Sequence, residues 1–200
     1  TGEFYLLQIR PIVDSKQMLE EDLRTIPDDR CLLRSHNSLG HGKSNDVVDV
    51  VYVKTDENFT AANNPEIACE IEHINRKFIA EGKNYVLIGP GRWGSSDSWL
   101  GVPVKWPHIS AAKVIVEVTL KNYSVDPSQG THFFQNLTSF GVGYFTIDEN
   151  KGMGFFRKET LDRMPAVEET AYVRHVRFEK PLYVLMDGLK QEGVIMQEEP

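Results

Sequence analysis

Cysteines, basic clusters and long apolar runs are all scarce in this sequence of 200 residues. Its two cysteines, Cys31 and Cys69, show neither a metal-binding nor a redox spacing, so no disulfide framework is indicated. No apolar run approaches the ~20 residues that a bilayer-spanning helix needs, and no signal peptide is visible. A formal net charge of -7 without a basic cluster argues against nucleic-acid binding. These absences favour a cytoplasmic protein with neither a nucleic-acid nor a membrane partner.

What is present suits a substantial core, because 40% of the residues are hydrophobic and 10% are aromatic. A helix is predicted over 64–82, where apolar residues recur at helical spacing between a cap-like start and Gly82. A second helix is predicted over 129–140. A short apolar run lies at 31–33, and strands are predicted at 47–53, 85–88, 114–120, 142–147, 154–157, 172–178, 182–186 and 193–196. The pattern predicts an α/β or α+β fold: a mixed, strand-rich sheet with a few short helices.

In the strand predicted at 114–120, polar and apolar residues alternate, which bears on how exposed each face of the strand is. Between 113 and 121, valine and leucine alternate with Lys113, Glu117, Thr119 and Lys121. Side chains alternate between the two faces of a strand. We therefore expect Glu117 to lie on a solvated face of the sheet.

The first dozen residues read as a buried strand with two polar side chains on one face. Gln8 and Arg10 share that face with Phe4 and Leu6. They lie about 7 Å apart, two strand rises, so both can reach one phosphate-bearing ligand. Arginine supplies the planar, permanently charged fork that such a ligand requires. The alternative is a strand with a polar end and no ligand.

The segment Leu7-Gln8-Ile9-Arg10-Pro11 resembles the end of the nucleotide-binding domain of phosphoenolpyruvate synthase and pyruvate phosphate dikinase. In that family a Leu-Gln-x-Arg-Pro segment closes an ATP-grasp site. The resemblance implies that Gln8 and Arg10 face a nucleotide, its phosphates and its metal. It also implies a parent protein that transfers a phosphoryl group from ATP with Mg²⁺. The family's lysine, phosphate-binding loops and acidic metal ligand are not in this chain, so we expect the chain alone to bind no cofactor and to be inactive.

The organisation that follows from this resemblance has three parts. Residues 1–13 are expected to be the last strand of an ATP-grasp domain, residues 14–29 a charged linker, and residues 30–200 an α/β domain of unknown role. Because the chain starts at Thr1 almost inside a strand, we expect it to be a piece of a longer protein. The partner of residues 1–13 would then be the upstream ATP-grasp domain of the same chain.

A glycine-rich loop at 89–101 is the first candidate site of the second domain. It follows a buried strand, and its glycines allow backbone amides to approach an anion closely. It is not a Walker A loop, because no Gly-Lys-Ser/Thr ending follows. The alternative is a tight turn held by Trp93 and Trp99. The expected anion-binding residues of this loop are Gly89, Gly91, Arg92, Ser95 and Ser96.

The segment 126–137 is the second candidate, because a helix start offers free amides and a partial positive charge. Ordinary helix capping is the alternative. Its residues Gly130-Thr131-His132 faintly resemble the phosphohistidine segment of the dikinase family. The spacing is one residue short and bulky phenylalanines follow, so we predict that His132 is not a phospho-carrier. The expected anion-binding residues here are Gln129, Gly130, Thr131 and His132, converging with Arg92 on one small anionic ligand.

No metal site is predicted in this chain. His36 and His41 lie in one loop near aspartates, but their spacing matches no recognised zinc pattern, and we read them as solvated. Two functions therefore stand side by side. The chain is part of an ATP-dependent phosphotransferase of the phosphoenolpyruvate synthase or dikinase type, or it is a non-catalytic anion-binding or regulatory module attached to a degenerate kinase-like domain.

Overall fold

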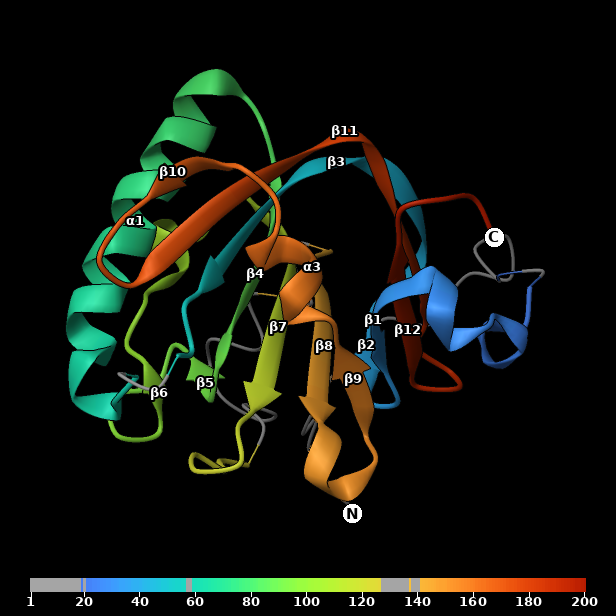
Figure 1. Cartoon of the computed structure of the whole chain (residues 1–200), viewed down its shortest axis with the longest axis horizontal. Helices are drawn as coiled ribbons and strands as arrows, with labels where there is room; N and C mark the ends of the chain where they lie inside the picture. The colour runs from blue at the N-terminus through green and yellow to red at the C-terminus, as the bar shows by residue number, and fades with distance from the viewer. Residues whose placement is uncertain (1–18, 20, 57–58, 127–136, 138–140) are drawn as a thin grey trace, which may run out of the picture.

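A computed structural model describes residues 19, 21–56, 59–126, 137 and 141–200 of the chain. The fold is mixed α+β, with a strand-rich, curled sheet and a few short helices (Figure 1), as the sequence predicts. The helices are α1 (Asn64–Glu81) and α3 (Lys158–Asp162), with 3-10 turns η2 (Leu23–Thr25), η3 (Asp28–Arg30), η4 (Ala61–Asn63), η5 (Trp106–His108) and η6 (Glu149–Lys151). The strands are β1 (Cys31–Ser35), β2 (Ser38–Leu39), β3 (His41–Val53), β4 (Tyr85–Pro90), β5 (Arg92–Trp93), β6 (Gly101–Val102), β7 (Ala112–Thr119), β8 (Gly143–Asp148), β9 (Gly154–Phe156), β10 (Ala166–Glu169), β11 (Val173–Asp187) and β12 (Glu192–Met196).

Within the described residues, the main sheet has the strand order β2-β8-β7-β4-β3-β11-β12-β1-β9, and β10 pairs with β11. The pairs β3–β4, β4–β7 and β7–β8 are parallel, and the remaining pairs of this sheet are antiparallel. In Figure 1 the long strands β3 and β11 arch from the α1 side over to β12 and β1. Hydrogen bonds of Thr146 in β8 stabilise the curl by joining it to β1 and the residues after β1. The Thr146 amide donates to the Asn37 carbonyl (3.1 Å), and the Thr146 carbonyl accepts from the Ser35 hydroxyl (2.6 Å).

The parallel strands are buried on both faces, as is typical when helices or further strands cover both sides of a sheet. One face packs against α1 through residues such as Ile71, Leu87 and Ile115. The other face points into the curl, where Val86 and Val116 meet side chains from the distant half of the sheet. This double burial explains why β4 is apolar at every position before its glycine.

Helix α1 confirms the predicted helix, with Gly82 in the left-handed conformation at its end (φ 63). The cap-like start of the predicted helix is Asn64, whereas in the structure Asn64 is the first helical residue and Asn63 is the N-cap. Asn64 is fully buried and its side chain donates to the Ser98 carbonyl (2.7 Å). None of the helices in the described part of the chain has both the length and the apolar character needed to cross a membrane.

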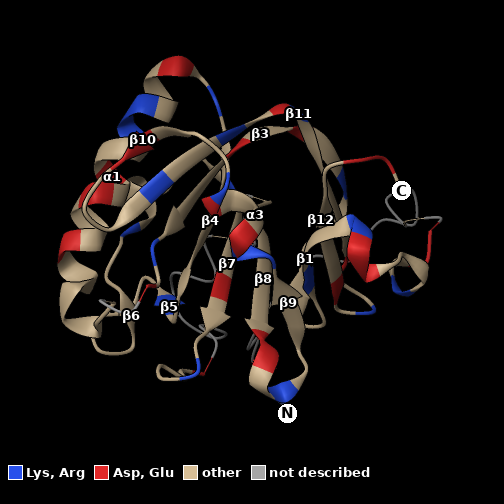
Figure 2. Ribbon diagram, in the orientation of Figure 1, with Lys and Arg blue, Asp and Glu red and all other residues tan. Residues whose placement is uncertain are grey.

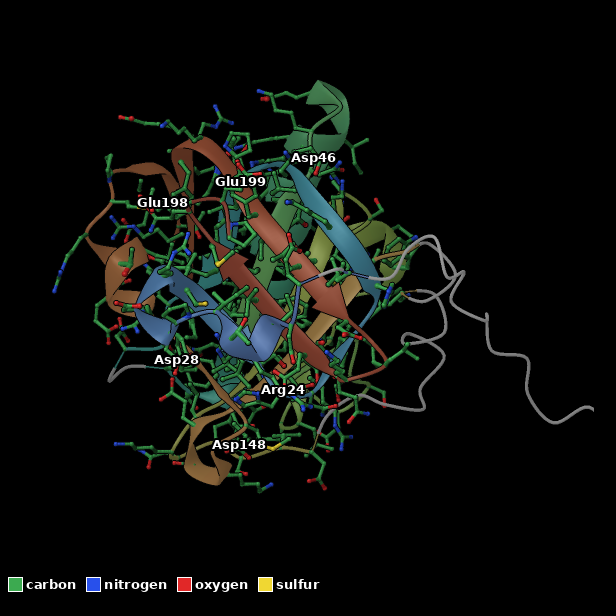
Figure 3. All side chains as sticks on the ribbon, turned by 90° about the vertical axis from the view of Figure 1, so that its right-hand side faces the viewer. Arg24, Asp28, Asp46, Asp148, Glu198 and Glu199 are labelled. Carbon is green, nitrogen blue, oxygen red and sulfur yellow. The ribbon has the colours of Figure 1, made fainter. Side chains whose placement is uncertain are left out.

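The turns η2 and η3 lie against the curled end of the sheet. Leu23 and Ile26 are buried in a small cluster with residues of β11 and β12. The buried Arg34 side chain binds the carbonyls of Leu23 (2.9 Å) and Ile26 (2.5 Å) and the Asp28 carboxylate (2.6 Å). Figure 3 shows the turns that carry Arg24 and Asp28 crossing in front of these strands. The described part of the predicted linker therefore packs on the sheet.

The expectation of a solvated face on β7 is wrong. Glu117 is only 3% exposed, and its neighbour on the same face, Ile115, is fully buried. The reason is tertiary, because α1 and the glycine-rich loop cover the face that the alternation assigned to solvent. Figure 2 shows acidic and basic residues interspersed along α1.

Candidate functional site

The carboxyl ends of β3, β4, β7 and β8 meet at one edge of the sheet, since these strands are parallel neighbours. This edge is where open α/β sheets usually bind ligands. Polar side chains follow each strand: Thr55 after β3, Arg92 after β4, Lys121 after β7 and Glu149 after β8. The candidate site is therefore this carboxyl edge, with the glycine-rich loop on its α1 side and a cavity on its inner side.

Trp93 fixes the glycine-rich loop to the sheet. Its buried indole Nε1 donates to the Val116 carbonyl (3.0 Å). Its ring covers Gly89 so closely that a Cβ built there would lie 2.4 Å from ring atom Cζ2. Gly101 is similarly confined, because a Cβ there would lie 2.0 Å from the Arg92 carbonyl oxygen. These glycines are explained by packing within the loop.

The backbone amides at the start of the loop are all engaged. Gly91 donates to the Val118 carbonyl (3.1 Å), Arg92 to the Leu100 carbonyl (3.1 Å) and Gly94 to the Val102 carbonyl (2.9 Å). The Trp93 amide donates to Glu117 Oε1 (3.0 Å). The anion-binding nest expected from consecutive amides is therefore not formed by residues 91–94, because protein acceptors already occupy these donors.

Arg92 is half-buried and held at one point. Its Nε donates to the carbonyl oxygen of Asp126 (2.5 Å). Within the described residues, no partner is found for its two terminal nitrogens. The other predicted donors of this loop differ: Ser95 Oγ donates to the Asp97 carbonyl (2.7 Å), whereas Ser96 is exposed. Arg92 is thus the predicted residue that the loop presents as a positioned cation.

Glu117 is a site residue that the sequence interpretation missed. Its carboxylate accepts the Trp93 amide on one oxygen and the Tyr144 hydroxyl (2.6 Å) on the other. A buried carboxylate with two donors ties the glycine-rich loop to β7 and β8. The sequence did contain a sign that Glu117 is buried. Ile115 lies two positions before Glu117 on the same face of the strand, and an apolar residue there argues against a solvated face.

Tyr123 joins the same loop to the start of α1. Its hydroxyl accepts from Asn64 Nδ2 (3.4 Å), and its ring lies against Gly91, where a Cβ would be 2.5 Å from ring atom Cε1. Burial raises the pKa of Tyr123, so the phenol stays neutral at physiological pH. This tyrosine therefore acts here as packing and hydrogen-bonding support for the loop.

A cavity of about 210 Å³ opens on the inner side of the edge. Apolar side chains from the ends of three strands and from β9 form part of its wall: Val53, Ile88, Val118 and Phe156. Charged side chains also line it: Lys121, Glu149, Lys158 and Glu159. The sequence interpretation singled out none of these residues as a site, because they come from six separate elements and the turn after β7, which only the curled sheet brings together.

The remaining predicted site residues belong to the first dozen residues and to the second candidate segment. The carbonyl of Asp126, the first residue of the second candidate segment, accepts a hydrogen bond from Arg92, so the described chain lies against Arg92 where that segment begins. Outside the described residues lie Gln8, Arg10, Gln129, Gly130, Thr131 and His132, and the convergence of the last four with Arg92 stays a prediction.

The two histidines at 36 and 41 have a simpler arrangement than a metal centre. The expectation that His41 is a solvated loop residue is wrong, because His41 is the first residue of β3 and its ring nitrogens are buried without a hydrogen-bond partner among the described residues. His36 Nδ1 lies 2.8 Å from Glu192 Oε2, and Arg24 Nε donates to the other oxygen of that buried carboxylate (3.2 Å). Across the described ranges, no group of three or more histidine, cysteine, aspartate or glutamate side chains is placed to hold a metal ion.

Comparison of the chain with protein-family models, with curated proteins and with solved structures found no match.

Proposed function

We propose that the domain from residue 30 onward binds a small anion at the carboxyl edge of its parallel strands, with Arg92 as the anchor. The observation that carries this proposal is the hydrogen bond from Arg92 Nε to the Asp126 carbonyl. It fixes the guanidinium, and because the described residues offer its two terminal nitrogens no partner, these can make a bidentate contact with phosphate or carboxylate oxygens. A cation that is already oriented loses less conformational entropy when a ligand binds.

Calorimetric titration of the 200-residue chain with inorganic pyrophosphate tests this proposal. We expect Arg92→Met to weaken binding about 10- to 100-fold, the loss that accompanies a missing charge-assisted contact of about 1.5–3 kcal/mol. Arg92→Lys keeps the charge but loses the fork, and should bind with intermediate affinity. The control is Arg76→Met, which removes an arginine exposed on α1 and paired with Glu72.

Equal affinity in wild type and Arg92→Met would contradict the proposal, and so would an absence of binding at millimolar pyrophosphate. Thermal melts of the variants check that each remains folded. Because the Arg92 amide and the Trp93 contacts belong to the backbone and to a different side chain, we expect the loop to survive the substitution.

We also propose, from the resemblance of Leu7–Pro11 alone, that the chain is part of a cytoplasmic ATP-dependent phosphotransferase of the phosphoenolpyruvate synthase or pyruvate phosphate dikinase type. An upstream ATP-grasp domain of the same chain would bind ATP and Mg²⁺. Gln8 would contact the nucleotide or its metal-bound phosphates, and Arg10 would neutralise phosphate charge. Phosphoryl transfer of this kind depends mainly on positioning and electrostatic stabilisation.

The intact parent protein provides the test of this second proposal. Arg10→Ala should lower ATP-dependent activity about 10- to 100-fold, equivalent to about 1.5–3 kcal/mol, while Arg76→Ala serves as the control. Unchanged activity in Arg10→Ala would refute the role of this arginine. A parent that lacks the upstream lysine, glycine loop and acidic metal ligand, and turns over no ATP, would instead favour the non-catalytic anion-binding module.

A further inference from the structure

The geometry points to a second binding site, in the cavity on the inner side of the carboxyl edge, for a small amphipathic zwitterion such as an apolar amino acid. The site goes beyond the proposed anion site, because Arg92 does not line the cavity. Its position at the mouth of the curled sheet, beyond the ends of parallel strands, is a common place for small ligands.

The apolar part of the cavity selects an apolar body. Ile88 and Val118 come from neighbouring parallel strands, and Phe156 faces them from β9. Val118 and Phe156 pack against the inner core cluster, so this wall is continuous with the core. With a volume of about 210 Å³, the cavity is smaller than the sites that hold drug-sized ligands, which indicates a compact occupant.

The charged part of the cavity selects a ligand with one group of each sign. Two of its charged side chains are already engaged: Lys158 Nζ donates to Asp162 (2.7 Å), and Glu149 Oε1 accepts the Phe156 amide (3.2 Å). Within the described part of the chain, the side chains of Lys121 and Glu159 have no partner.

Lys121 and Glu159 stand on different walls, one after β7 and one in α3. The lining as a whole carries two lysines and two glutamates, so its charges balance and favour neither a simple anion nor a simple cation. A carboxylate on Lys121 and an ammonium on Glu159 would engage both of these side chains at once, while the apolar body packs against Ile88, Val118 and Phe156.

Three related probes distinguish this ligand class: L-leucine, 4-methylpentanoate, which lacks the ammonium, and 3-methylbutylamine, which lacks the carboxylate. Calorimetry on the 200-residue chain should show binding of L-leucine, with each single-charge analogue binding at least about ten-fold more weakly. Lys121→Met and Glu159→Gln should each weaken L-leucine binding by a similar factor.

The exposed pair Lys83 and Glu81 at the end of α1 supplies matched controls, Lys83→Met and Glu81→Gln, which should leave L-leucine binding unchanged. Arg92→Met should also leave it unchanged, so failure here is distinguishable from failure of the anion site. The inference is overturned if no probe binds at millimolar concentration. It is equally overturned if 4-methylpentanoate binds as tightly as L-leucine and Glu159→Gln has no effect, since the site would then recognise a simple anion. All five substituted residues are at least partly exposed, so the variants should fold, and thermal melts verify this.

Discussion

At the scale of single residues, the buried Asp49 and His175 and the partly exposed Arg177 form a cluster that joins β3 to β11. Asp49 Oδ1 lies 2.7 Å from His175 Nε2 and accepts from Arg177 Nε (2.8 Å). Phe78 of α1 packs edge-on against the His175 ring. Burial by itself would raise the pKa of Asp49, but the hydrogen bonds from His175 and Arg177 outweigh it, and the net effect lowers this pKa. The carboxylate is therefore ionised in the folded protein at neutral pH.

Asp49→Asn should destabilise the fold by about 2–4 kcal/mol in urea unfolding, because the neutral amide loses the charge that pairs with Arg177 and places an NH2 donor where Asp49 Oδ2 accepts from Arg177 Nη2. We expect less than the full cost of a buried pair, since Arg177 is 40% exposed and solvent screens part of its charge. Asp46→Asn is the matched control: the same strand carries Asp46, but its carboxylate is exposed, and the change should stay within about 1 kcal/mol. Similar losses in the two variants would contradict the assignment.

Because the pKa of Asp49 is lowered in the folded protein, the loss of stability in Asp49→Asn should depend on pH. The stability that the ionised carboxylate contributes is fully present above the unfolded-state pKa of about 4. It is lost as the pH falls through the lower pKa of the folded state. The difference in unfolding free energy between wild type and Asp49→Asn should therefore shrink between about pH 5 and about pH 3. A difference that stays constant over this range would argue against Asp49 as the titrating group.

At the scale of elements, α1 is the part of the chain whose pattern and packing agree most closely. Its apolar residues at helical spacing all face the sheet, and Ile71 is fully buried. Ile79, on the same helix, is 53% exposed.

Ile71→Ala should cost about 2–5 kcal/mol in unfolding free energy, since it removes core contacts and leaves a cavity. Ile79→Ala should change stability by no more than about 0.5 kcal/mol. Equal effects would mean that α1 does not pack as described.

Two strands that the sequence predicts separately form the single strand β11 in the structure. The sequence predicts strands at 172–178 and 182–186, interrupted by Glu179, Lys180 and Pro181, but β11 runs unbroken from Val173 to Asp187. Its pairing with β3 shifts register between Arg177 and Leu182. Bulges of this kind bend a strand and tolerate proline, which cannot donate to the ladder. The interruption therefore marks the bend of a single strand.

At the scale of the whole molecule, the curl of the sheet decides where the sites lie. It places α3 and β9 opposite the ends of β4 and β7, which creates the cavity, and it leaves the glycine-rich loop on the α1 side of the same edge. The two sites use different charged side chains, because Arg92 does not line the cavity. Each proposed ligand can then be tested without disturbing the other.

The sequence alone determined the local features: helix α1 with its glycine end, most strands, the mixed α+β class and the cationic Arg92 after a buried strand. These follow from periodicity, turn residues and residue type, which act over short stretches of chain. Tertiary structure decided the burial of Glu117, the occupation of the loop amides from Gly91 to Gly94, the partner of His175 and the existence of the cavity. Each of these depends on which distant segment covers a given face, and the periodicity of one strand carries no information about that neighbour.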